Sequence, residues 1–299
     1  MMPDLPPDLL AILKSNAPDI RNPVSVVRQN FSAFIEEMKE EDYEPPEIES
    51  VEIGKSLRGY WIGSPDAIPD QAVLFFHGGT FNFGSTKDQL EVCSRIALAS
   101  QTRVFSVDYR LAPEYIFPAP IDDAVTAYEY LLSRGYQAHR IIPAGISAGG
   151  TLVIDLLLSI RDKGIPLPPA GVCISPFVDM LFEGESVIKN IDNDWLTPEI
   201  LGTIRTIYLA GHDPRDPLAS PVCAHLSGLP RLYIQAGTHE MLLSDIASFV
   251  DKARWAGVPV QFEIWEGMFH LWQLFSRQVP EGERAIEQAG TYIHDAIAR

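Results

Sequence analysis

The sequence of 299 residues contains little cysteine: only Cys93, Cys173 and Cys223, with no C-x-x-C spacing. Three thiols in a chain of this length do not form the framework of a small disulfide-stapled secreted domain. We therefore expect reduced, buried thiols. The seven histidines do not cluster with cysteines or carboxylates in the manner of metal ligands, so we expect no metal site.

Basic side chains are also scarce, with 23 Lys and Arg against 40 Asp and Glu, giving a formal net charge of −17. This excess repels phosphate backbones and anionic lipid headgroups, so we expect neither nucleic-acid binding nor membrane attachment. Residues 1–4 lack the basic and apolar regions of a signal peptide, and the most apolar stretch, 141–160, is interrupted by Pro143, Gly145 and Asp155. We predict a cytoplasmic protein.

Short apolar runs of strand length alternate with helical patterns from about Val51 onward. Pro120, for example, opens an apolar face with helical periodicity that closes at Gly135. Such alternation is typical of βα units on a mostly parallel central sheet flanked by helices, an α/β fold. The predicted strands are 72–76, 103–107, 140–143, 171–175, 231–236 and 260–265.

Two segments fall outside this alternation. Val27, Phe31, Phe34 and Met38 form a one-faced helical stripe within residues 1–45, and the acidic run 36–44 reads as a solvated linker. More than fifty residues separate the predicted strands 171–175 and 231–236, too many for a plain crossover.

We therefore predict a helical cap made of residues 1–45 and an insertion, 177–220, over a catalytic domain of residues 46–176 and 221–299. Thr197-Pro198-Glu199 is a helix start within the insertion. The aromatic residues of both cap parts are candidates to line a pocket, although such residues pack on one another first. They are Phe31, Phe34, Phe182, Trp195 and Tyr208.

Gly145-Ile146-Ser147-Ala148-Gly149 lies between a predicted strand and a predicted helix. In that context a G-x-S-x-G sequence describes a nucleophile elbow, in which a tight turn exposes the serine hydroxyl and the next backbone N–H faces an oxyanion. The alternative is an ordinary βα turn with Ser147 as a helix cap.

Together with His77-Gly78-Gly79 after the strand 72–76, this elbow resembles the hormone-sensitive-lipase-like esterases of the α/β-hydrolase fold. The resemblance extends over nearly the whole chain through residues 108–114, 117–119, 122–123 and 213–221. It implies a Ser-acid-His carboxylesterase with a helical cap and without metal or organic cofactor. It also implies an oxyanion hole formed by the backbone N–H groups of Gly78, Gly79 and Ala148.

One position departs from the family pattern, which usually has a third glycine where this chain has Thr80. Threonine is β-branched and stiffer than glycine. It either narrows the substrate pocket or reshapes the loop toward Phe81, and the sequence leaves both possibilities open.

The catalytic base and acid are expected late in the chain, in the order Ser, acid, His. His270 follows the last predicted strand in a short loop and precedes an apolar helix predicted from Leu271. For the acid, Glu240 ends the loop after strand 231–236, whereas Asp245 lies a turn into the next helix. The loop position favours Glu240, with Asp245 as the alternative.

The predicted activity is hydrolysis of small, short-acyl esters through an acyl-enzyme on Ser147. A lactonase or amidase would use the same triad, and a non-catalytic ligand-binding member would share the fold, although such a member typically loses the serine or the histidine. The expected partner is a small-molecule ester, and a homo-oligomer, most simply a dimer, is the expected assembly.

Overall fold

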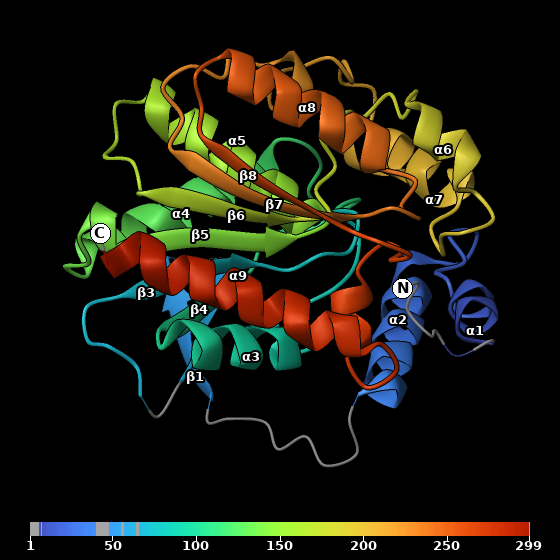
Figure 1. Ribbon diagram of the computed structural model, residues 1–299, viewed down its shortest axis with the longest axis horizontal. Coiled ribbons are helices and arrows are strands. Elements are labelled where there is room, and N and C mark those ends of the chain that lie inside the picture. The colour runs from blue at the N-terminus through green and yellow to red at the C-terminus, as the bar shows by residue number, and fades with distance from the viewer. Residues whose placement is uncertain (1–5, 7, 40–47, 55–56, 64–65, 299) are drawn as a thin grey trace.

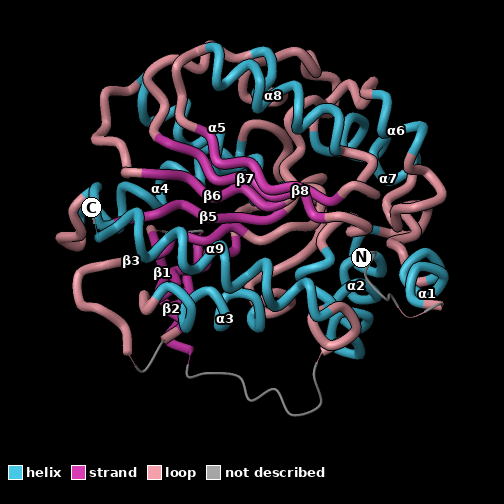
Figure 2. Tube along the Cα trace, viewed as in Figure 1, coloured by secondary structure: helices cyan, strands magenta, loops and turns pink. Residues whose placement is uncertain are grey.

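The computed structural model describes residues 6, 8–39, 48–54, 57–63 and 66–298. Eight strands form one sheet in the order β1-β2-β4-β3-β5-β6-β7-β8, drawn in magenta in Figure 2. The first two pairings are antiparallel and all others parallel, which confirms the mostly parallel α/β sheet. The strands are β1 (Ile48–Ile53), β2 (Leu57–Ile62), β3 (Ala72–Phe76), β4 (Arg103–Asp108), β5 (Ile141–Ile146), β6 (Ala170–Ile174), β7 (Arg231–Gly237) and β8 (Val260–Trp265).

The sequence reasoning missed the β1–β2 hairpin at the sheet edge. β1 is mostly exposed and carries Glu49, Ser50 and Glu52, so it has no apolar run of the kind that marked the central strands. A strand at an edge needs to bury only part of one face, and its sequence signal is correspondingly weak.

Helices cover both faces of the sheet (Figure 1). One face packs on α3 (Leu90–Ser100) and α9 (Pro280–Ala298), the other on α4 (Ala119–Ser133), α5 (Ala148–Asp162) and α8 (Leu243–Trp255). Within β3, the side chains of Val73 and Phe75 pack on the face covered by α3 and α9, while those of Leu74 and Phe76 pack on the opposite face. A strand buried on both faces reads as a continuous apolar run.

The remaining helices gather at the carboxyl end of the sheet (Figure 1). They are α1 (Leu9–Ser15), α2 (Val24–Met38), α6 (Glu185–Lys189) and α7 (Pro198–Thr203), the last continued by a π-helical turn to Tyr208. The predicted stripe on α2 is confirmed because Val27, Phe31 and Phe34 are buried. The Lys14 ammonium connects α1 to the loop after α6 by donating to the carbonyls of Ile191 and Asp192.

Some sequence-based expectations concern residues that the structure does not describe, and one, on the cysteines, is partly wrong. Residues 1–4, most of the acidic run and the boundary at residues 45–46 lie outside the described residues. Cys93 and Cys173 are buried, but Cys223 is exposed, contrary to expectation, because it lies in a surface turn after Pro221. Among the described helices, none has the length and apolar character needed to cross a membrane.

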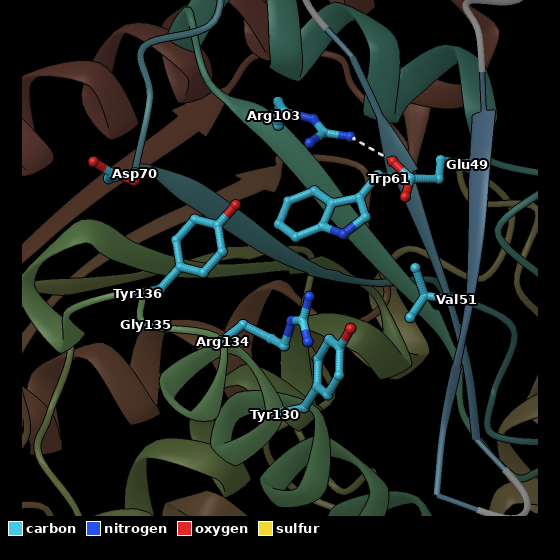
Figure 3. Close-up of a pocket in the computed structure, with 9 residues that line it drawn as sticks. All are labelled: Glu49, Val51, Trp61, Asp70, Arg103, Tyr130, Arg134, Gly135 and Tyr136. Atoms are coloured by element: carbon cyan, nitrogen blue, oxygen red, sulfur yellow. Dashed lines mark hydrogen bonds and ion pairs between the residues drawn. The ribbon is translucent and has the colours of Figure 1, made fainter.

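A groove of about 730 Å³ lies at the amino ends of β3 and β4, the end of the strands opposite the nucleophile elbow (Figure 3). Its aromatic wall includes Tyr136, whose ring centroid is 5.6 Å from that of Trp61. The Arg103 guanidinium lies 4.6 Å above the Trp61 ring and pairs with Glu49 at 3.3 Å. These contacts brace the edge of the sheet.

Candidate active site

Ser147 occupies the sharp turn between β5 and α5, with φ +54° and ψ −122°. Only a tightly packed turn holds a non-glycine residue in this conformation, which costs about 1–3 kcal/mol. The flanking glycines make the packing possible: a Cβ on Gly149 would lie 1.9 Å from the Phe76 carbonyl oxygen, and one on Gly145 would lie 2.3 Å from the Gly149 carbonyl oxygen. The structure thus forms the strand-turn-helix context of an elbow.

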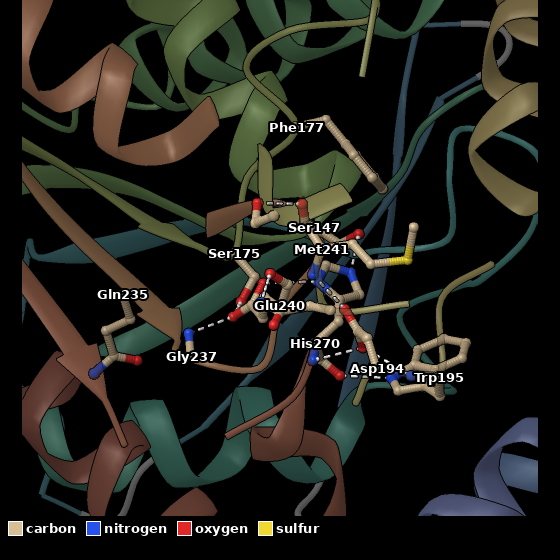
Figure 4. A network of polar contacts seen from close by, with 12 residues as sticks. Ser147, Ser175, Phe177, Asp194, Trp195, Gln235, Gly237, Glu240, Met241 and His270 are labelled. Atoms are coloured by element: carbon tan, nitrogen blue, oxygen red, sulfur yellow. Dashed lines mark hydrogen bonds and ion pairs between the residues drawn. The ribbon is translucent and has the colours of Figure 1, made fainter. Parts of the chain in front are cut away.

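The structure brings together the three residues that the sequence analysis selected, although 123 residues separate the first from the last. Ser147 Oγ lies 3.0 Å from His270 Nε2, and His270 Nδ1 lies 3.1 Å from Glu240 Oε2 (Figure 4). All three side chains are buried. Each comes from a loop at the carboxyl end of a strand, β5, β7 or β8. The parallel sheet collects these loops on one edge.

Glu240 is held on both of its oxygens. Its Oε1 accepts from Ser175 Oγ at 2.7 Å and from the Gly237 N–H at 2.7 Å, which leaves Oε2 directed at His270 (Figure 4). Asp245 lies elsewhere, in the first turn of α8 beside Gly184, and makes no hydrogen bond to His270.

Burial sets the electrostatics of this pair. It raises the pKa of Glu240 to about 8, against which the hydrogen bonds from Ser175 and Gly237 act. It lowers the pKa of His270 to about 4, against which the negative charge of Asp194 acts. Both shifts disfavour charge in a site closed to water. Because the two groups are in contact, the protonation of one depends on that of the other, and they titrate as a pair.

The oxyanion loop differs from the expectation at one donor. The Gly78 N–H donates to Gln89 Oε1 at 2.9 Å, so it is not free to bind an oxyanion. In the described part of the chain, the N–H groups of Gly79, Thr80 and Ala148 have no acceptor. Thr80 has φ +52°, in the left-handed region that favours glycine. The loop therefore keeps its turn despite the threonine.

Sequence reasoning missed several residues around the triad. Ser175 directly follows β6, and only its position at a strand end hinted at the site. Asp194 comes from the insertion and accepts from the His270 N–H, and its neighbour Trp195, which the sequence analysis named only as a pocket candidate, donates to the His270 carbonyl. Gln89 and Tyr109 hold the oxyanion loop, the latter by donating to the His77 carbonyl at 2.7 Å. No local pattern marks Asp194 or Gln89 as part of the site.

The predicted helix after His270 is wrong in its extent. Leu271 adopts a left-handed conformation, a single 3₁₀ turn covers Trp272–Phe275, and the next helix, α9, begins only at Pro280. Reversing the chain at Leu271 keeps His270 on a short loop facing Ser147.

The aromatic candidates pack mainly on other rings. Phe31 lies 4.7 Å from Phe83, and Phe34 lies 6.2 Å from Phe275, between ring centroids. Tyr208 stacks on Phe81 at 3.9 Å and so covers the oxyanion loop. The other two lie nearer the triad: Phe182 packs on Phe177, whose ring is 5.8 Å from that of His270, and Trp195 lies 6.0 Å from His270.

A buried serine, histidine and carboxylate linked in a row above a mostly parallel sheet define an α/β-hydrolase. A family model described as the alpha/beta hydrolase fold matches residues 73–274. The acetyl-hydrolase of Streptomyces hygroscopicus is 42% identical over 227 residues, 76% of each chain. An esterase of Acinetobacter venetianus is 34% identical over 218 residues, 72% of each chain.

Solved structures agree with the sequence relatives. The crystal structure of an esterase from the bacterial hormone-sensitive lipase family superposes with a TM-score of 0.91 at 39% identity, covering 96% of each chain. The present chain belongs to this family of hormone-sensitive-lipase-like esterases within the α/β hydrolases. It is a carboxylesterase, as the resemblance implied.

Proposed function

We propose that this carboxylesterase cleaves small, short-acyl esters through a Ser147-His270-Glu240 triad. The observation that carries the proposal is the continuous series of buried contacts from Ser147 Oγ through the imidazole to the Glu240 carboxylate, each 3.1 Å or shorter. His270 Nδ1 donates to Glu240, so its Nε2 is left unprotonated to accept the serine proton.

In the first half of the reaction Ser147 Oγ attacks the ester carbonyl carbon while its proton passes to His270 Nε2. The tetrahedral intermediate collapses, the C–O bond to the alcohol breaks, and Nε2 returns the proton to the departing oxygen. Water then attacks the acyl-enzyme by the same route and releases the acid. Glu240 stabilises the imidazolium of each step and holds its tautomer.

The oxyanion would rest on the N–H groups of Gly79 and Ala148, with the Thr80 N–H in place of the occupied Gly78. Successive N–H groups in a turn with positive φ converge on an anion, which supports this assignment. A single lost donor of this kind costs about 10²–10³ in rate.

The substrate proposal rests on enclosure. Ser147 and His270 are at most 2% exposed, and the rings of Phe177 and Trp195 lie about the imidazole. Each further acyl methylene adds about 0.8 kcal/mol of contact only until the pocket is full. Rates should therefore peak at acyl chains of roughly two to six carbons. We propose that residues 1–45 and 177–220 supply the cap that covers the triad, over the catalytic domain of residues 46–176 and 221–299.

A panel of p-nitrophenyl esters of increasing acyl length, with simple lactones alongside, tests both parts of the proposal. Wild type should be fastest on short linear esters, and Ser147→Ala should be inactive on all of them. A maximum at long-chain triglycerides would indicate a lipase instead, and strong turnover of lactones with little on linear esters would indicate a lactonase. A serine-directed organophosphate should inactivate wild type by labelling Ser147.

A further inference from the structure

Asp194 and Trp195 form a buried dipeptide in the loop between α6 and α7, outside the triad. The Asp194 side chain is fully buried. Its Oδ1 accepts from the backbone N–H of His270 at 3.0 Å and of Trp195 at 2.8 Å, and its Oδ2 accepts from the Met241 N–H at 2.8 Å. One carboxylate therefore bridges the residue that bears the base and the residue after Glu240 (Figure 4).

The same loop makes further hydrogen bonds to the backbone of the segments that carry His270 and Glu240. The Trp195 indole Nε1 donates to the His270 carbonyl at 2.6 Å, so both backbone groups of His270 are held from the insertion. Asn190 Nδ2 donates to the Glu240 carbonyl at 2.8 Å and to the Thr238 carbonyl at 3.0 Å. Asn190, Asp194 and Trp195, all from the insertion, thus hold the segments that carry Glu240 and His270.

We propose that Asp194 is a positioning residue for ester hydrolysis: it fixes His270 between Ser147 and Glu240, and its negative charge stabilises the imidazolium formed when Ser147 is deprotonated. Trp195 shares the positioning through its indole N–H but contributes no charge. The inference rests on the proposed triad and assigns part of its assembly to the cap insertion.

The charges around Asp194 support the electrostatic half of the inference. Burial raises the pKa of Asp194 to about 6, and the neighbouring charge of Glu240 acts in the same direction, whereas three backbone N–H donors and the charge of His270 favour the ionised form. Asp194 is therefore ionised above about pH 6. Its charge raises the pKa of His270, opposing the effect of burial.

Three variants separate charge from position. Asp194→Asn keeps the size of the side chain but removes the charge and one acceptor, and Trp195→Phe removes only the indole donor and part of the ring. Asp192→Asn, on an exposed residue of the same loop, is the matched control. The measurements are kcat and KM for p-nitrophenyl acetate, the pH profile of kcat/KM from about pH 4 to about pH 9, and a thermal melt.

Asp194→Asn should lower kcat by about 10²-fold with little change in KM, as a small displacement of a catalytic group does. The acid limb of its kcat/KM profile should move to lower pH by about one unit, because the negative charge of Asp194, which raises the pKa of His270, is lost. Trp195→Phe should lower kcat without moving that limb, and Asp192→Asn should match wild type.

A folded Asp194→Asn enzyme with wild-type kcat and an unmoved acid limb would overturn the inference. Should that variant fail to fold, the test passes to Trp195→Phe, which retains the carboxylate: a folded Trp195→Phe enzyme with unchanged kcat would equally overturn the positioning role. Failure of the triad itself has a different signature, since Ser147→Ala would then retain activity while these variants could take any value.

Discussion

Replacing Glu240 by glutamine tests how the acid acts on the base. Glutamine has nearly the same shape as glutamate, so it can occupy the same buried position in either of two orientations. The structure decides between them, because the Oε1 position faces two hydrogen-bond donors, Ser175 Oγ and the Gly237 N–H, each at 2.7 Å. The other position faces His270 Nδ1 at 3.1 Å.

If the glutamine oxygen occupies the first position, both donors keep their acceptor and the NH₂ group faces His270. In the reverse orientation the Gly237 N–H points at another N–H donor. A buried donor left without a partner costs about 1–3 kcal/mol, which favours the first orientation about 5- to 150-fold. The imidazole must then accept at Nδ1 and carry its proton on Nε2, where it can no longer take a proton from Ser147.

Glu240→Gln should therefore lower kcat by about 10³–10⁴, the scale that a triad held in the wrong tautomer shows. The assay is the initial rate of p-nitrophenyl acetate hydrolysis over a range of concentrations, with a thermal melt to establish that the variant is folded. Asp245→Asn is the matched control, since it also replaces a buried carboxylate by an amide but at a residue that does not contact His270. It should keep kcat within about tenfold of wild type. A folded Glu240→Gln enzyme with nearly full kcat, or a larger loss in Asp245→Asn, would refute the reasoning.

Three further predictions follow from the same site and its surroundings. Ser147→Ala should abolish ester hydrolysis and leave the melting temperature nearly unchanged, because the turn is held by Gly145 and Gly149; residual activity above a few per cent of wild type would contradict the nucleophile assignment. The kcat/KM of wild type should rise with pH, because the first proton to enter the Glu240–His270 pair removes the base whichever group takes it, and the midpoint should lie near the higher of the two pKa values, about 8, rather than near the His270 value of about 4. Asp155 is buried with no hydrogen-bond partner among the described residues, and burial raises its pKa well above 3.8, so folding must take up a proton once the pH exceeds the unfolded value. The melting temperature of Asp155→Asn relative to wild type should therefore increase between about pH 5 and about pH 8, and a difference independent of pH would contradict the assignment.

The sequence by itself determined the features that depend on neighbours along the chain. The apolar runs predicted six of the eight strands, most clearly β3, β5 and β6, since strands buried on both faces admit few polar residues. The glycines around Ser147 marked a turn that needs close backbone approach, and the structure shows the contact that requires it. Glu240 and His270 were selected because each follows a strand of the parallel sheet, whose carboxyl ends must meet at one edge.

Tertiary structure alone decided which polar groups are partners. Nothing in the local pattern shows that Gln89 occupies the Gly78 N–H, that Ser175 bonds to Glu240, or that Asp194 holds the His270 backbone from 76 residues away. Helical and strand periodicity reports which face of an element is buried, but not which residue of another element it meets there. Those contacts arise only when the cap insertion and the strand ends pack together, and burial then forces each polar group to find a partner.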